Sequence, residues 1–196
     1  MAKGSLGDNW EHFNSLIGVK IQKKERPKIE IIMEHLITDP SLKNGLQQIV
    51  DVLKENNIKP TWFTTSHYKF KYNKEIILQV KFGDGFKFRE NEVEVKVLIS
   101  PVEMERFEEF LTDEMRNIAT KMVENRTFMT CGGRSHCDNR KDFEYKGKQY
   151  KQVCTANLNM VILLLFSHTK NLDEQFQTIA EWIKTLIIFK MFNRTK

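Results

Sequence analysis

Apolar and polar residues alternate along most of residues 61–99, which is the pattern of β-strands with one buried face. Turn-forming residues interrupt this alternation at Asn73-Lys74 and at Gly83-Asp84-Gly85, where glycine and aspartate tolerate positive φ. We therefore predict an antiparallel β-meander over this segment. The side chains expected on its buried face are Trp62, Tyr68, Phe70, Leu78, Val80, Val95 and Val97.

Helical periodicity flanks the meander on both sides. Apolar residues recur at helical spacing over residues 28–37 and again over residues 41–57. Another helix is predicted after Ser100-Pro101, because proline is favoured in a first helical turn. The most regular stripe predicts a helix over residues 172–190. Its buried face would consist of Phe176, Ile179, Trp182, Ile183 and Leu186.

Two further strand segments come late in the chain. Residues 143–153 are predicted to form a hairpin around Lys146-Gly147-Lys148, and residues 157–166 are apolar enough for a central strand. Strands thus come in runs between helices, which is typical of an α+β fold and not of alternating parallel units. We predict a single α+β domain over residues 41–192, with an antiparallel β-meander sheet flanked by helices. A helical N-terminal extension would occupy residues 1–40.

Composition limits the classes of function. The 196 residues carry a net charge of +5 that is spread over both halves of the chain, whereas nucleic-acid binders usually concentrate basic residues on one face or tail. The longest apolar run, Met160–Phe166, is far shorter than the ~20 residues that cross a bilayer. The first residues lack the apolar core of a secretory signal, and three cysteines are too few for a disulfide framework. We therefore expect a cytoplasmic protein that binds neither a membrane nor nucleic acid.

The strongest candidate for chemistry is the cysteine loop, defined here as residues 125–142. It contains Cys131, His136 and Cys137, and Cys154 follows seventeen residues after Cys137. Three thiolates and one imidazole can close a tetrahedral zinc site, and a pair of glycines would let the loop curl around the ion. Against a zinc site, five residues separate the first two cysteines, which is more than the usual two to four.

Two other interpretations of this loop stay open. Arg134 and the adjacent glycines could bind a phosphate or carboxylate, although the full spacing of a phosphate-binding loop is missing. Alternatively, Cys131 and Cys137 are unlinked thiols and Cys154 packs as a small hydrophobic residue. Nucleophilic catalysis finds little support, since the five histidines are scattered and most glutamates of residues 103–109 are expected to face water.

The aromatic side chains of the first predicted strands allow a different kind of site. Trp62, Tyr68, Phe70 and Tyr72 share one strand face, while the neighbouring lysines take the other. This separation favours a buried core over a base-stacking platform, in which rings and cations would interleave. If the sheet curves over a cavity, the same face lines a ligand pocket with Trp62 and Tyr68 in its wall.

A series of features along residues 45–190 carries a family resemblance. In order, these are Pro60-Thr61-Trp62 before the strands at 68–76, the strand at 93–99 running into Ser100-Pro101-Val102-Glu103, and the strand at 159–166 before the helix at 172–187. In these features the chain resembles YdhG-like bacterial domains, small proteins sometimes described as frataxin-like iron chaperones. It is also similar to a set of uncharacterised proteins from Gram-positive bacteria, which share the Pro-x-Trp segment, a cysteine-containing loop and a hairpin like Tyr150–Cys154. The resemblance implies the fold and a lean towards small-ligand or metal handling, but no particular reaction.

Two functional hypotheses follow. The first is a binding module that holds a small molecule or a metal near the sheet face and the cysteine loop. Its candidate residues are Trp62, Tyr68 and Arg134 for a ligand, and Cys131, His136, Cys137 and Cys154 for a zinc ion. The second is an interaction or regulatory protein that docks on a partner through its N-terminal helical segment, using the helix predicted over residues 28–37 and the basic stretch Lys20, Lys23, Lys24, Arg26 and Lys28. Docking of that kind would leave Ile29, Ile32 and Leu36 exposed.

Overall fold

The computed structural model describes residues 26–64, 66–83, 90–124, 140–154, 160–166 and 171–193. The chain divides into two compact units, which we describe separately. The first unit comprises residues 1–96 and 163–183, and the second comprises residues 97–162 and 184–196. Strands β4 (Val93–Ile99) and β7 (Met160–Phe166) and helix α7 (Leu172–Phe192) contribute residues to both units.

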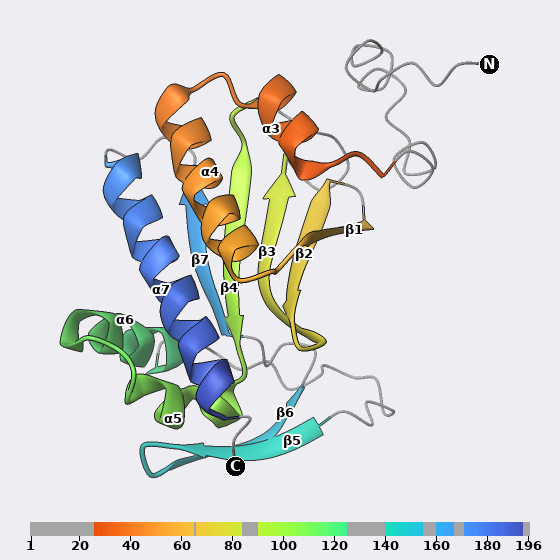
Figure 1. Ribbon diagram of the computed structural model, residues 1–196. Helices are drawn as coiled ribbons and strands as arrows, with labels where there is room; N and C mark the ends of the chain where they lie inside the picture. The colour runs from red at the N-terminus through yellow and green to blue at the C-terminus, as the bar shows by residue number, and fades with distance from the viewer. Residues whose placement is uncertain are drawn as a thin grey trace. The chain divides into compact units, whose positions relative to one another are not determined.

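The main sheet has the strand order β1-β2-β3-β4-β7 (Figure 1), with β1 at Pro60–Thr64, β2 at His67–Tyr72 and β3 at Glu75–Phe82. Strands β1 to β4 form the antiparallel meander, which confirms the sequence prediction. Six of the seven side chains expected on the buried face are at most 1% exposed, and the exception is Trp62, which is half-buried. Trp62 remains partly exposed because β1 lies at the end of the described strand order.

A β-bulge shifts the register of β2 against β3. Before the bulge Phe70 lies opposite Leu78, and after it Lys71 lies opposite Ile76. Ile77 is the extra residue and is only 1% exposed, whereas strict alternation would bury Ile76 in its place. The alternating pattern fails here because it carries no sign of the extra residue.

Helices α3 (Ile29–Leu36) and α4 (Pro40–Glu55) lie with the first part of α7 on one face of the sheet (Figure 1). The apolar face of α3 is buried as its periodicity predicts. Asp39 caps α4 by accepting a hydrogen bond from the Leu42 amide at 2.8 Å, and Pro40 occupies the first helical turn. Pro40 therefore opens α4, whereas the sequence prediction begins this helix one residue later.

The connection between α3 and α4 is fastened to the residues that precede β4. The Asn91 side chain accepts hydrogen bonds from the Thr38 and Asp39 amides at 2.9 and 3.0 Å. The Asn91 amide in turn donates to the Leu36 carbonyl at 2.9 Å. Helix α3 is thus held to the first unit by backbone hydrogen bonds, and a domain boundary at residue 40 stays a prediction.

The second unit contains η2 (Pro101–Glu103), α5 (Met104–Glu108), α6 (Asp113–Glu124) and a hairpin of β5 (Arg140–Tyr145) and β6 (Lys148–Cys154). The hairpin confirms the prediction around Lys146-Gly147-Lys148. Lys146 and Gly147 take φ values of 49° and 75°, as a two-residue type I′ turn requires.

Strand β7 confirms the predicted strand but not its predicted position. It lies beside β4 at the end of the described strand order, and not in the centre of the sheet. An apolar run indicates that both faces of a strand are covered, and says nothing of how many strands pair with it. The prediction of a central strand is therefore wrong.

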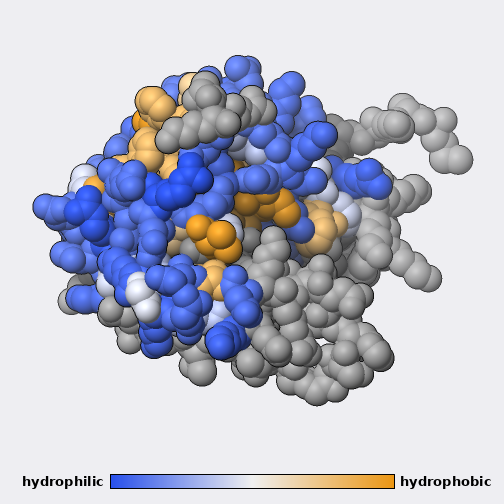
Figure 2. Space-filling view, turned by 90° about the horizontal axis from the view of Figure 1, so that it is seen from below, coloured by the Kyte–Doolittle hydropathy of each residue, from blue (hydrophilic) through white to orange (hydrophobic). Residues whose placement is uncertain are grey.

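The apolar stripe of α7 is buried as predicted, with all five expected side chains at 0% exposure. In the second unit, Phe189 continues this stripe and packs against Phe107 and Phe110, with ring centroids 5.3 and 5.5 Å apart. Phe110 and Phe192 form the exposed edge of this ring cluster, at 37% and 63% exposure. Figure 2 shows hydrophobic residues in small groups among hydrophilic ones, as is ordinary for a protein surface.

Candidate functional site

A pocket of about 810 Å³ lies in the first unit, where the start of α3, the end of α4 and strands β1 and β2 meet. Its lining combines an apolar part with a charged part. The apolar part consists of Pro27, Ile29, Pro60, Trp62 and Tyr68. The charged part consists of Arg26, Lys28, Glu30, Lys54 and Lys59, and Asn57 and Thr61 complete the lining.

The end of α4 determines how two of the lysines reach this pocket. Asn57 takes a left-handed φ of 59°, and the Asn57 and Ile58 amides donate to the Lys54 and Leu53 carbonyls at 2.9 and 2.8 Å. This is the Schellman arrangement, which ends a helix and reverses the chain at once. The chain therefore enters β1 directly, and Lys54 and Lys59 border the same pocket.

The aromatic wall comes from two residues that face each other across β1 and β2. Trp62 lies opposite Tyr68 in the ladder. The Tyr68 hydroxyl donates a hydrogen bond of 2.7 Å to the Pro27 carbonyl, which fixes the segment that leads into α3. The Trp62 indole Nε1 is buried and has no hydrogen-bond partner among the residues that the structure describes. An indole N–H in this position is a donor that still lacks an acceptor.

The charged part is mainly cationic. Lys54 pairs with Glu30 at 3.1 Å, and both side chains are nearly half exposed. Burial raises the pKa of Glu30, but its hydrogen bond to its own backbone amide and the charge of Lys54 outweigh burial and lower that pKa below its usual value. Within the described ranges, Lys28 and Lys59 form no ion pair. Among the described residues that line it, the pocket therefore carries more positive than negative charge.

Burial of Tyr68 predicts a loss of stability in alkaline solution. Burial, and then the nearby charge of Glu30, raise the pKa of Tyr68 above its ordinary value of 10.0. The unfolded chain releases this proton near pH 10 and the folded chain keeps it, so the contribution is complete below about pH 10 and falls as the pH rises further. Denaturant unfolding between about pH 9 and 11 should show this decline. Tyr68→Phe should flatten it, and Tyr72→Phe, in the same strand, should not; equal slopes in all three proteins would contradict the expectation.

The structure brings together two of the predicted site residues, Trp62 and Tyr68. Arg134, Cys131, His136 and Cys137 lie outside the described residues. Cys154 ends β6 opposite Arg140, and its side chain is not among those described. In the part of the chain that the structure describes, no group of three or more histidine, cysteine or acidic side chains could hold a metal ion. The zinc site of the cysteine loop stays a prediction.

Sequence reasoning missed the cationic side of the pocket. Lys28, Lys54 and Lys59 come from the start of one helix, the end of the next and the strand entrance, so no motif joins them. The sequence contains one sign of this cationic side, the basic stretch that ends at Lys28. The docking hypothesis assigns the charge of that stretch to contact with a partner. Only the fold shows that Arg26, Lys28 and the end of α4 border one pocket.

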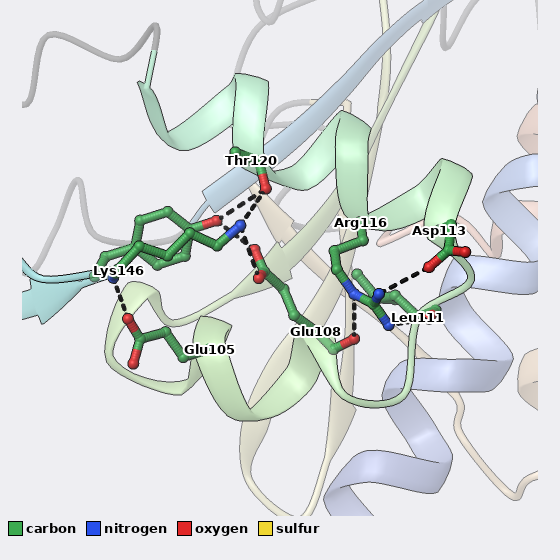
Figure 3. A network of polar contacts seen from close by, with 8 residues as sticks. Glu105, Glu108, Leu111, Asp113, Arg116, Thr120 and Lys146 are labelled. Atoms are coloured by element: carbon green, nitrogen blue, oxygen red, sulfur yellow. Dashed lines mark hydrogen bonds and ion pairs between the residues drawn. The ribbon is translucent and has the colours of Figure 1, made fainter.

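A second polar cluster lies in the second unit, around Glu108 (Figure 3). Most glutamates of residues 103–109 are expected to face water, and Glu108 is an exception that is only 6% exposed. Its carboxylate accepts a hydrogen bond from the Tyr145 hydroxyl and pairs with Lys146 at 3.2 Å. The Lys146 ammonium also donates to the Thr120 hydroxyl at 2.6 Å. This network braces the β5–β6 hairpin against α5 and α6, because Glu108, Thr120 and the hairpin residues come from those three elements.

Removing the Tyr145 hydroxyl should destabilise the protein. Tyr145→Phe leaves a buried carboxylate with one donor fewer, which costs about 1–3 kcal/mol of unfolding free energy. Tyr150→Phe is the matched control, since Tyr150 is half-buried and stacks on Phe143 through its ring. Chemical unfolding of both variants measures the difference, and equal losses would mean that the Glu108 contact contributes nothing specific.

Among the described residues, no helix is both long enough and apolar enough to cross a membrane. Comparison of the chain with protein-family models, with curated proteins and with solved structures gives no match.

Proposed function

We propose that this chain is a binding module that holds a small molecule in the pocket beside Trp62 and Tyr68. The observation that carries the proposal is the pocket itself, whose volume of about 810 Å³ falls within the range of sites for small ligands. Such sites combine an apolar lining with a few polar groups that orient the ligand. The apolar and charged parts of this lining have that composition.

Two features of the walls support binding over an ordinary surface hollow. The Tyr68 hydroxyl and the Lys54–Glu30 pair hold neighbouring segments in place, so part of the site is formed before a ligand arrives. Trp62 contributes an aromatic side chain to the apolar part of the lining. We propose YdhG-like domains as the family. The resemblance to them implies small-ligand or metal handling, which agrees with a binding module.

Docking through the N-terminal helical segment is less well supported. It requires an exposed apolar face on α3, but Ile29, Ile32 and Leu36 are at most 3% exposed. A partner would have to displace α3 from the first unit before it reached these side chains. The pocket needs no such rearrangement, and we therefore favour the binding module.

Thermal unfolding in the presence of a panel of small aromatic compounds tests this proposal. A ligand that binds only the folded chain raises its unfolding free energy by about 2.7 kcal/mol at a hundredfold excess over its dissociation constant. Trp62→Ala should abolish the effect. Phe63→Ala is the matched control, because Phe63 is the next residue in β1, is 51% exposed and does not line the pocket. The proposal fails if no compound stabilises the protein, or if both variants lose the effect equally.

A further inference from the structure

We infer that the ligand of this pocket is an organic anion: a carboxylate or similar acidic group on a flat apolar body. The inference rests on the proposed function and specifies its ligand class. The placement of charges and hydrogen-bond donors around the pocket supports this inference. No sequence motif indicates that placement.

The charge of the lining selects against cations. Four cationic side chains line the pocket, and Glu30 is the only carboxylate among the lining residues. Glu30 is already paired with Lys54, and Lys28 also lowers its pKa. Lys28 and Lys59 form no ion pair with a described residue, so a ligand anion has two ammonium groups available to it. An amine ligand would meet mainly like charges there, because four of the five charged lining residues are cationic.

The hydrogen-bonding groups of the lining also select for acceptors on the ligand. Lysine ammonium groups donate hydrogen bonds and accept none. The Tyr68 hydroxyl already donates to the Pro27 carbonyl. Lys28 lies at the N-terminal end of α3 and its side chain does not cap that helix, so the positive end of the helix dipole adds to the same potential. A ligand with several acceptor oxygens satisfies these donors.

The apolar part of the lining favours a ligand that has an apolar body as well as a charge. Trp62, Pro60 and Pro27 offer flat or rigid apolar surfaces, and the Trp62 ring is partly exposed. A small inorganic anion would leave this surface in contact with water. An aromatic or similarly flat body covers it and gains the free energy of apolar burial.

Four probes separate charge from body, and isothermal titration calorimetry measures their affinities. Naphthoate carries both features, naphthylmethanol has the body alone, naphthylmethylammonium has the wrong charge, and inorganic phosphate has the charge alone. We expect naphthoate to bind about tenfold more tightly than naphthylmethanol, with no detectable binding of the other two. The advantage of naphthoate should shrink as salt is added, because the lysines are at the protein surface.

Two pairs of substitutions locate the charge effect. Lys28→Gln with Lys59→Gln should remove the roughly tenfold advantage of naphthoate over naphthylmethanol, while naphthylmethanol still binds. Retained binding of the neutral probe also shows that this variant is folded. Lys43→Gln with Lys121→Gln is the control, because both residues are exposed and neither lines the pocket.

The outcomes distinguish the ligand class from the function. Equal binding of naphthoate and naphthylmethanol by the wild type contradicts an anionic ligand but does not contradict the proposed binding module. Binding of phosphate as tight as that of naphthoate contradicts the requirement for an apolar body on the ligand. Failure of every probe, together with no stabilisation by the wider panel of compounds, removes the proposed function and the inference with it.

Discussion

Replacing Trp182 with alanine is expected to lower the free energy of unfolding by about 3–5 kcal/mol, the usual loss when a large buried aromatic side chain is removed. Trp182 is among the largest fully buried side chains of the protein, at 0% exposure. Truncation removes its apolar surface from the core and leaves a cavity that the rigid neighbouring backbone cannot fill. A loss of this size is a large part of the total stability of a typical domain.

Ile188→Ala is the matched control for Trp182→Ala. Ile188 belongs to the same helix and is also apolar, but it is 46% exposed, so its truncation should cost below about 1 kcal/mol. Urea unfolding of the two variants beside the wild type measures both effects. A loss for Trp182→Ala as small as that for Ile188→Ala would mean that the stripe of α7 is not core.

The sequence predicts α7 and the meander correctly because burial imposes a period on each. Ile179 and Ile183 recur four residues apart in the helix, and Tyr68 and Phe70 recur every second residue in the strand, so one buried face explains each series. The alternation of buried and exposed side chains breaks at Ile77, where a bulge adds one residue to β3. A bulge depends on how two strands pair, and the pattern of a single strand does not contain that information.

The candidate site could be predicted only in part. Trp62 and Tyr68 belong to adjacent strands, so strand parity alone places them near one another. Lys28, Lys54 and Lys59 reach the pocket through the Schellman turn at Asn57 and the hydrogen bond from Tyr68 to Pro27. The hydrogen bond from Tyr68 joins segments 41 residues apart, and composition alone gives no sign of it. The sequence likewise does not indicate which glutamate of residues 103–109 is buried, since Tyr145, the partner of Glu108, comes from a distant hairpin.

Gly45 provides the second large effect, because α4 lies in close contact with α7 at this residue. A Cβ atom added at Gly45 would overlap the ring of Phe176, with the Cε2 carbon only 2.6 Å away. Gly45→Ala would by itself favour the helix by up to about 1 kcal/mol. We expect the opposite sign, a net loss of about 1–3 kcal/mol, because the ring or the helix must shift to admit one methyl group.

Asn44→Ala controls for helix propensity in this experiment. Asn44 is the preceding residue of α4 and is exposed, so alanine there should be neutral or slightly stabilising. Combining Gly45→Ala with Phe176→Leu should cost less than the sum of the single substitutions, by about 0.5–3 kcal/mol, because the smaller side chain makes room for the new methyl group. The four unfolding free energies form a double-mutant cycle that isolates this contact. If Gly45→Ala stabilises the protein as Asn44→Ala does, or if the cycle is strictly additive, then α4 and α7 do not meet at Gly45 and Phe176.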